Sequence, residues 1–199
     1  MSRPVILAST SQTRIAMLAS AGVAVEALGA SVDEAAVKES LKAEGASVED
    51  CAETLAELKA LALSRRYPDA LVIGADQMLA CEGRWFDKPT DKAAARAQLL
   101  DLRGRKHQLV TAAAVLLGGQ RIWHSIDKAD LVMRPFSEAF LDDYLDRAGD
   151  AVLSSVGAYQ LEGLGAQLFT QVKGDVFTIL GLPLLPLLDF LREHGVLLR

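Results

Sequence analysis

Short apolar runs that alternate with helix-like segments are the feature of this sequence that most limits its fold. The run "PVILA" at residues 4–8 is typical of a strand, a helical pattern follows from about Ser11 to Ala21, and "VAVEAL" at residues 23–28 again has strand character. A strand, a helix and a second strand make a β-α-β opening. This order favours an α/β fold.

The next elements follow from helix caps and helix breakers. The polar stretch from Ser31 to Gly45 is expected to cross the surface before the next helix. Ser47 is a good N-cap, and the helix that it begins should run to about Tyr67, where Pro68 ends it. Acidic residues in its first turn and arginines in its last turn suit the helix dipole. A long helix is therefore predicted here.

The rest of the chain continues the mixture of strands and helices. Residues 70–86 predict an apolar strand and then a hairpin that turns at Glu82 and Gly83. Residues 107–133 predict two antiparallel strands joined at a pair of glycines. Helices are expected from Thr90 to about Leu102, from Ser137 to about Arg147 and from Pro183 to near His194. The order predicts a single α/β domain over residues 1–199, with a mixed central sheet and flanking helices.

Composition excludes several classes of protein. The chain has 199 residues, and its apolar runs are broken by Gly, Pro or Asp before they reach the roughly 20 residues of a membrane span. No secretion signal precedes the first strand, so we expect a cytoplasmic protein. The net charge of −5 argues against a general nucleic-acid surface, and an anionic substrate would need locally concentrated cations. Cys51 and Cys81 are expected to be buried free thiols.

The stretch "ILASTSQTRIAML" at residues 6–18 places hydroxyl groups and a cation at a strand-to-helix junction. Backbone N–H groups at a helix N-terminus favour an anion, and Ser11 with Arg14 adds donors one turn apart. Ordinary capping by Ser11 beside a solvated Arg14 is the alternative.

The tetrad "GADQ" at residues 74–77 is a second candidate site. Asp76 follows a buried run and a glycine, which would put it at the carboxyl end of a strand, where open α/β sheets bind ligands. Such an Asp can bind a divalent metal or take a proton from water, and a turn-forming Asp is the alternative. Gln77 beside it can read a base edge.

Two lysines and a glycine-rich stretch complete the candidates. Lys59 lies close to the buried face of its helix, which is unfavourable for an ammonium group unless an anion lies opposite, although a snorkelling lysine also fits. Lys88 precedes a proline and so lies in a restricted loop. The stretch "GAYQLEGLG" at residues 157–165 is compatible with a flat ligand or with a simple loop.

Seven motifs in this order resemble the Maf family of nucleoside triphosphate pyrophosphatases: "LASTSQTR", "VDE", "LAELKA", "IGADQ", "DKP", "GAYQLEG" and "GLPL". The resemblance spans nearly the whole chain. It implies a mixed α/β fold with a long nucleotide cleft, and hydrolysis between the α and β phosphates to a nucleoside monophosphate and pyrophosphate. It also implies a divalent metal, Mg²⁺ or Mn²⁺, and a homodimer as one assembly to expect.

The resemblance also implies roles for individual residues. Asp76 would be the catalytic base, and Glu34 would help it to hold the metal. The groups that grip the triphosphate would be Ser11, Arg14, Lys59 and Lys88. These cations and the metal would offset the charge that develops on the leaving pyrophosphate. The family commonly has Ser-Pro-Arg-Arg where this chain has Ser-Gln-Thr-Arg at residues 11–14, so one arginine and the proline are missing.

Three positions match places where the family varies with the base: Thr13, Gln77 and Glu162. Gln and Glu at the last two resemble the branch that acts on 7-methyl-GTP rather than the branch that acts on dTTP and UTP. A carboxylate at Glu162 can accept hydrogen bonds from guanine N1–H and N2–H₂, whereas it would face the acceptors O4 and O2 of a pyrimidine. We therefore expect a housecleaning enzyme with a guanine-type substrate. The alternatives are a dTTP/UTP pyrophosphatase and a regulatory nucleotide-binding protein in cell division or septum formation.

Overall fold

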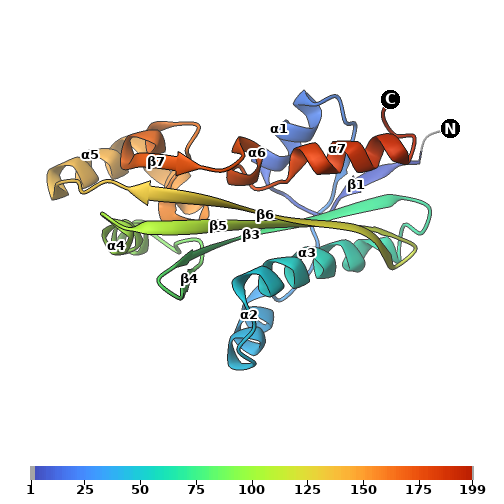
Figure 1. Ribbon diagram of the computed structural model, residues 1–199, viewed down its shortest axis with the longest axis horizontal. Helices are drawn as coiled ribbons and strands as arrows, with labels where there is room; N and C mark the ends of the chain where they lie inside the picture. The colour runs from blue at the N-terminus through green and yellow to red at the C-terminus, as the bar shows by residue number, and fades with distance from the viewer. Residues whose placement is uncertain (1–2, 199) are drawn as a thin grey trace. The chain divides into compact units, whose positions relative to one another are not determined.

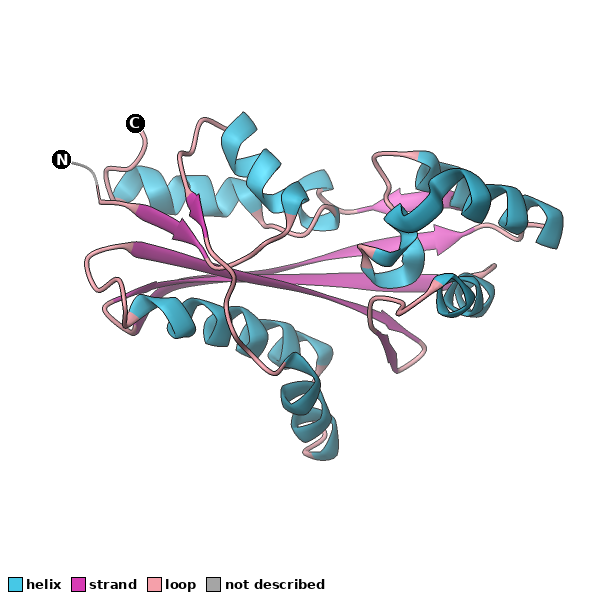
Figure 2. Cartoon of the chain, turned by 180° about the vertical axis from the view of Figure 1, so that it is seen from behind, coloured by secondary structure: helices cyan, strands magenta, loops and turns pink. Residues whose placement is uncertain are grey.

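The computed structural model describes residues 3–198, which form an α/β protein (Figures 1 and 2). The strands are β1 (Val5–Leu7), β2 (Glu26–Ala27), β3 (Leu71–Cys81), β4 (Arg84–Phe86), β5 (Lys106–Leu117), β6 (Gln120–Met133) and β7 (Phe169–Lys173). The α-helices are α1 (Gln12–Ser20), α2 (Glu34–Ala43), α3 (Val48–Ser64), α4 (Lys92–Leu102), α5 (Glu138–Ala148), α6 (Val176–Ile179) and α7 (Leu184–Glu193). The 3₁₀ helices are η1 (Gly149–Leu153), η2 (Val156–Ala158) and η3 (Leu164–Leu168). No helix within these residues is both long and apolar enough to cross a membrane.

Two compact units can be distinguished along the chain. The first unit comprises residues 1–77, 110–127 and 176–199, and the second unit comprises residues 78–109 and 128–175. The strands β3, β5 and β6 each contribute one part to either unit. That the whole chain forms one domain stays a prediction.

The sheet is mixed, as the sequence predicts. Its strand order within the described residues is β2-β1-β3-β5-β6-β7, with β4 paired to β3. In the first unit β1 pairs in parallel with both β2 and β3, which is the pairing that a β-α-β opening requires. In the second unit β4 is antiparallel to β3, and β7 is antiparallel to β6.

Helices cover both faces of the strands in the first unit, and alternating side chains separate the two cores (Figure 1). On one face Val5, Leu71 and Ile73 pack with Met17 of α1 and Leu187 of α7. On the opposite face the intervening strand residues pack against α3; this core contains Ile6, Val72, Ala114, Leu116, Ala60 and Leu63. Because neighbouring residues of one strand point to opposite faces, each strand helps to build both cores.

The second unit packs helices around the hairpin strands. The α4 helix contacts α5 and the 3₁₀ helices η1 and η2. Its buried centre includes a polar pair, in which His107 Nε2 and the Tyr159 hydroxyl share a hydrogen bond of 2.8 Å. The ring of Phe169 packs edge-on against Tyr159. Gly157, with φ +80°, leaves room here, because a Cβ would lie 2.6 Å from Leu79 Cδ1.

Most predicted helix boundaries are confirmed, because they depend on local caps. Ser11, Ser47 and Ser137 are the N-caps of α1, α3 and α5, and each side chain accepts a hydrogen bond from the backbone three residues on. The α3 helix ends at Ser64, earlier than predicted. The N-cap of α4 is Asp91, not Thr90, since the Asp91 carboxylate accepts from Ala94 N at 2.7 Å.

The stretch between Ser31 and Gly45 lies at the surface, as predicted, but most of it forms the α2 helix rather than a connection that precedes the next helix. Asp33 caps this helix by accepting a hydrogen bond from Ala36 N at 3.1 Å. None of its residues is buried, and Val37 and Leu41 are its only bulky apolar residues, so the sequence pattern offers a short signal for this helix. Its first residue, Glu34, belongs to the site described below.

Candidate active site

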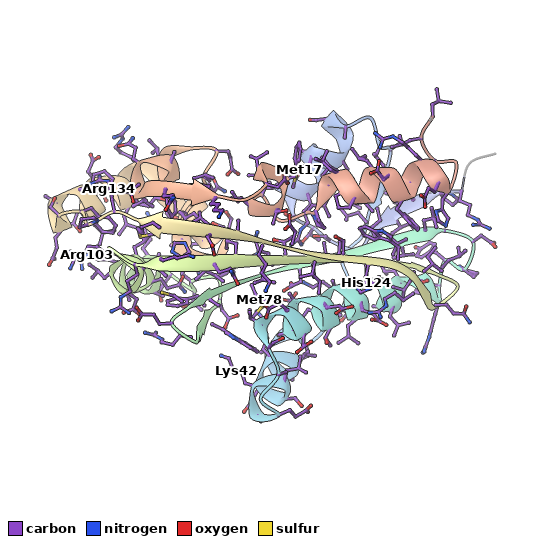
Figure 3. The ribbon with its side chains drawn as sticks, in the orientation of Figure 1. Met17, Lys42, Met78, Arg103, His124 and Arg134 are labelled. Carbon is purple, nitrogen blue, oxygen red and sulfur yellow. The ribbon has the colours of Figure 1, made fainter. Side chains whose placement is uncertain are left out.

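Close packing of α3 on β3 brings the first two site residues together. Gly74 of β3 faces α3, and a Cβ on it would lie 2.0 Å from the Ala56 carbonyl oxygen and 2.8 Å from Ala60 N. Only a glycine allows the helix to lie this close to the strand. Lys59 extends from α3 near this contact, and Asp76 extends from β3, two residues beyond Gly74. Met78, which Figure 3 labels, lies two residues further along the same strand.

Lys59 forms ion pairs with two carboxylates. Its Nζ is 2.6 Å from Asp76 Oδ1 and 2.8 Å from Glu34 Oε1. The exposed fractions of the Lys59 and Asp76 side chains are 11% and 8%, whereas that of Glu34 is 44%. The anion that a buried lysine needs is therefore present, and the lysine is not the snorkelling type. The structure thus brings together three of the predicted site residues.

Asp76 lies inside β3, and the prediction that it ends a strand is wrong. The strand continues for five residues after it, to Cys81, and its last three residues, Leu79 to Cys81, pair with β4. A strand interior holds the Asp76 backbone rigidly. The carboxylate is therefore aimed by the sheet rather than by a turn.

One oxygen of Asp76 remains available for chemistry. Asp76 Oδ2 is buried and has no hydrogen-bond partner among residues 3–198. A buried, unpaired carboxylate oxygen is unfavourable unless a water, a metal or a substrate group satisfies it. Hard oxygen ligands of this kind suit Mg²⁺ or Mn²⁺, and Glu34 supplies a second carboxylate nearby. The described residues contain no group of three or more His, Cys, Asp or Glu side chains arranged to hold a metal, so water or phosphate oxygens would complete the coordination.

Arg14 is held by backbone carbonyls rather than solvated. Its Nε donates to the Gly181 carbonyl at 2.7 Å, and its Nη1 donates to the Ala75 carbonyl at 3.0 Å. Burial lowers the pKa of the Arg14 guanidinium, while the Asp76 and Glu34 carboxylates raise it. A guanidinium keeps its charge under these conditions. The cation therefore has a fixed position beside Asp76.

The N-terminus of α1 provides further donors. Ser11 Oγ accepts from Arg14 N at 3.5 Å, and Ser11 N donates to Ser9 Oγ at 3.2 Å. Capping by Ser11 is thus confirmed, and its hydroxyl hydrogen is not used by this cap. Thr13 lies in the first turn of the same helix and is partly exposed.

Gln77 follows Asp76 on β3 and belongs to the first unit. Its side chain lies on the opposite face of β3 from Asp76, since adjacent strand residues alternate. Its amide nitrogen Nε2 donates hydrogen bonds to Thr111 Oγ1 and to the carbonyl oxygens of Thr178 and Ile179.

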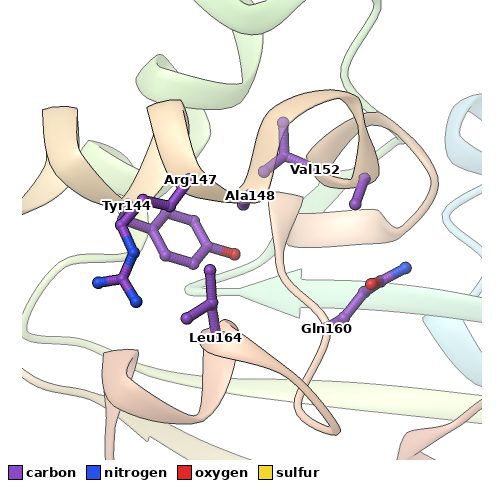
Figure 4. A pocket seen from close by; sticks show the side chains of 8 residues that line it. Tyr144, Arg147, Ala148, Val152, Gln160 and Leu164 are labelled. Carbon is purple, nitrogen blue, oxygen red and sulfur yellow. The ribbon is translucent and has the colours of Figure 1, made fainter.

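The remaining predicted residues belong to the second unit. Lys88 follows β4 in an exposed loop, and Glu162 is exposed in a turn before η3. The glycine-rich stretch around Glu162 packs on its own backbone, because a Cβ on Gly165 would lie 2.4 Å from the Gln160 carbonyl. Gln160 and Leu164 border a hollow of about 210 Å³, together with Tyr144 and Val152 (Figure 4).

The sequence does not reveal the hydroxyls and backbone carbonyls that hold the site's side chains. The hydroxyls belong to Ser9 and Thr111, and the carbonyls to the segment at residues 178–181, in which Gly181 begins the motif "GLPL". Gly181 has φ +102°, and a Cβ on it would lie 3.5 Å from the Arg14 guanidinium. A glycine in a motif at this position was the one available signal, since backbone carbonyls leave no trace in side-chain patterns.

Comparisons with known proteins find relatives that match nearly the whole chain. The sequence model of a family described as Maf-like protein matches residues 4–194. A nucleoside triphosphate pyrophosphatase of Paramagnetospirillum magneticum is 59% identical over 96% of this chain and 99% of its own. A nucleoside triphosphate pyrophosphatase of Rhodospirillum rubrum is 57% identical over 98% of this chain and 96% of its own. A 7-methyl-GTP pyrophosphatase of Rhizobium meliloti is 47% identical over 96% of each chain.

Proposed function

Because this chain belongs to the Maf-like protein family, we propose that it is a nucleoside triphosphate pyrophosphatase. It hydrolyses the bond between the α and β phosphates and releases a nucleoside monophosphate and pyrophosphate. The names of its relatives support this activity, since several are nucleoside triphosphate pyrophosphatases and one is a 7-methyl-GTP pyrophosphatase. The observation that carries the proposal is the Asp76 carboxylate, with one oxygen on Lys59 and the other buried without a partner in the part of the chain that the structure describes.

Asp76 acts as the general base in this proposal. Lys59 holds Oδ1 at 2.6 Å, so the carboxylate has a defined orientation, and Oδ2 is left to accept a proton from the attacking water. A carboxylate that is fixed before substrate binds needs little reorganisation during the reaction. Positioning of the water then accounts for a large part of the rate enhancement.

The triphosphate is bound by groups that also stabilise the leaving group. Arg14 supplies a fixed charge, and Lys59 supplies an ammonium that is already close to the base. The N–H groups at the start of α1 and the Ser11 hydroxyl add neutral donors for phosphate oxygens. We assign Lys88 to the same task on the strength of the "DKP" motif.

A divalent metal, Mg²⁺ or Mn²⁺, fits this site through Asp76 and Glu34. The fit rests on the two carboxylates, which share Lys59 and keep oxygen lone pairs for a cation, while Asp76 Oδ2 keeps its role as proton acceptor. When bound, the metal would neutralise charge on the phosphate oxygens and on the pyrophosphate that leaves. Two carboxylates suffice because Mg²⁺ usually completes its shell with phosphate oxygens and water.

We further propose a guanine-type base, such as 7-methyl-GTP, over a pyrimidine. Glu162 would accept hydrogen bonds from guanine N1–H and N2–H₂, and Thr13 stands where pyrimidine-acting relatives tend to have an arginine. If UTP and dTTP are instead the better substrates, the proposed role of Glu162 is wrong while the pyrophosphatase activity stands. The proposal also includes a cytoplasmic location and no role in binding nucleic acid or membranes. A homodimer is also proposed, and light scattering in solution would test it.

The decisive test combines a nucleotide panel with one substitution. Purified protein with Mg²⁺ or Mn²⁺ is given 7-methyl-GTP, GTP, UTP and dTTP, and both pyrophosphate and monophosphate are quantified. Asp76→Asn should lower kcat by at least about 100-fold, because an amide cannot accept the proton. Asp101→Asn is the matched control, since Asp101 pairs with Arg84 on the surface of the second unit.

Two outcomes would contradict the proposal. Undiminished pyrophosphate release by Asp76→Asn would remove Asp76 from the mechanism. A wild-type protein that binds nucleotides without turnover would instead support the regulatory function in cell division or septum formation.

A further inference from the structure

The short helix α6 ends in a turn that holds Arg14. Leu182 N donates to the Phe177 carbonyl at 3.0 Å. Gly181 N donates to the Thr178 carbonyl, also at 3.0 Å, and the two bonds together form a Schellman motif. Gly181 has the positive φ, +102°, that this motif requires, and its carbonyl accepts from Arg14 Nε at 2.7 Å. The direction of the guanidinium therefore depends on where this turn lies.

Three neighbouring strands of the first unit bind the turn at Thr178. The Thr178 hydroxyl donates to Asp127 Oδ2 of β6 at 2.7 Å, and the Thr178 carbonyl accepts from the Thr111 hydroxyl of β5 at 2.9 Å. Gln77 Nε2 of β3 donates to the same carbonyl at 3.0 Å and to the Ile179 carbonyl at 3.0 Å. The strands β3, β5 and β6 are adjacent in the sheet. The sheet therefore sets the position of the turn.

The hydroxyl of Thr178 does more than fill space. Thr178 is fully buried, and a buried hydroxyl is unfavourable unless it is hydrogen-bonded, so valine would suit a position that only needed packing. Its bond to the Asp127 carboxylate is charge-assisted, which makes it roughly twice as strong as a bond between neutral groups. Phe177 and Leu180 add apolar contacts, but such contacts are not directional. A helix of four residues is not stable alone, so α6 depends on these contacts for its orientation.

We propose that Asp127 is a positioning residue for Arg14. By binding the Thr178 hydroxyl it fixes the turn at the end of α6, and the Gly181 carbonyl of that turn orients the Arg14 guanidinium for the triphosphate. The role rests on the proposed function, in which Arg14 binds phosphate oxygens. Asp127 itself contacts neither the substrate nor the metal.

The remaining bonds of Arg14 define which of its hydrogens would meet phosphate. Its Nε is bound to the Gly181 carbonyl, and its Nη1 is bound to the Ala75 carbonyl and lies 3.5 Å from Ser9 Oγ. Within the described residues these bonds leave the two hydrogens on Nη2 for a ligand. A shift of the turn would therefore move the phosphate-binding edge of the guanidinium.

The first test measures KM for the nucleotide of the panel that the wild-type protein hydrolyses fastest. Thr178→Val keeps the shape of the side chain and removes its hydroxyl, and Asp127→Ala removes the acceptor. We expect each variant to raise KM by about threefold to tenfold, the range for one lost hydrogen bond. Thr178→Ser should restore the wild-type KM. Asp189→Ala is the matched control that leaves KM unchanged, since Asp189 pairs with Arg192 on the exposed side of α7 in the same unit.

A double-mutant cycle separates positioning of Arg14 from a general structural role. In an Arg14→Lys background, Thr178→Val should change KM by less than about twofold, because the guanidinium that the turn orients is absent. An equal rise of KM in both backgrounds would show that Thr178 acts elsewhere and would overturn the inference. An unchanged KM in folded Thr178→Val would do the same.

The orientation of Arg14 can also be measured without substrate. The Nε–H resonance of Arg14, identified by its loss in Arg14→Lys, should exchange with water at least about tenfold more slowly than that of the exposed Arg147. Asp127→Asn keeps an acceptor oxygen, so it serves where Thr178→Val does not fold. Its neutral amide binds the Thr178 hydroxyl more weakly, and the Arg14 resonance should exchange at least about threefold faster than in the wild type. Equal exchange rates in the two proteins would contradict the role of Asp127.

Failure of the proposed function gives a different result from failure of this inference. If the wild-type protein hydrolyses no nucleotide of the panel, the proposed function fails. The dissociation constant for inorganic triphosphate then replaces KM in the same double-mutant cycle. A constant that rises in Thr178→Val only when Arg14 is present supports the positioning role, and a constant that stays the same refutes it.

Discussion

Gly74→Ala should separate α3 from β3 and thereby damage both stability and catalysis. The added Cβ would lie 2.0 Å from the Ala56 carbonyl oxygen, about 1.4 Å inside the 3.4 Å at which ordinary contact begins. It would also lie 2.8 Å from Ala60 N. Both close atoms belong to the helix backbone, so no side-chain rotation relieves the contact. The helix or the strand must move by about 1 Å.

The magnitude follows from two opposing terms. Replacing a glycine stabilises by about 0.4–1 kcal/mol, because the unfolded chain has less entropy to lose. Overpacking a buried contact destabilises by about 1–3 kcal/mol, and backbone-to-backbone contact lies at the upper end. We therefore expect a net loss of about 2 kcal/mol in the free energy of unfolding. A misplacement of about 1 Å between Lys59 and Asp76 should lower kcat by about 100-fold.

Urea unfolding followed by circular dichroism measures the first effect, and steady-state pyrophosphate release measures the second. Gly29→Ala is the matched control, because its Cβ would meet Thr10 Cγ2 at an ordinary 3.4 Å without an unusual φ. An unfolding free energy of Gly74→Ala equal to that of Gly29→Ala would refute the close packing. A destabilised variant with wild-type kcat would refute the claim that this packing positions Lys59.

Three further predictions concern single side chains. Lys59→Met should lower kcat by about 100-fold, since Asp76 loses the ammonium that orients it, and wild-type pyrophosphate release would contradict this. Arg14→Lys should raise KM for nucleotide by about tenfold, because one amine cannot span the two carbonyls that the guanidinium binds; an unchanged KM in steady-state kinetics would argue against it. Burial lowers the pKa of His107 from 6.5 to about 4, so the folded protein resists protonation of this side chain. The free energy of unfolding should therefore be highest above pH 6.5 and fall by roughly 3 kcal/mol as the pH falls towards 4. His107→Gln should flatten this loss in urea unfolding between pH 7.5 and 4.5, and equal slopes for both proteins would contradict the assignment.

Much of the fold could be predicted because its signals are local. Caps such as Ser47 and short apolar runs such as that of β1 depend on neighbours within one turn or one strand. The α2 helix is not predicted because Val37 and Leu41 are its only bulky apolar residues, in a stretch that is otherwise polar or small. The length of β3 was missed because Gly74 and Asp76 resemble a turn, whereas the close approach of α3 requires the glycine within a strand.

The sequence by itself determined the types of groups at the site and the elements that carry them. It indicated a lysine near a buried helix face, an aspartate next to an apolar run and a helix N-terminus with Ser11 and Arg14. Only the tertiary structure decided their partners. The Asp76 contact of Lys59 spans 17 residues of chain, the Thr178 contact of Gln77 spans 101, and the Gly181 contact of Arg14 spans 167. Such contacts depend on strand order and on how closely a helix approaches a sheet, and these arise from packing of the whole unit rather than from any local pattern.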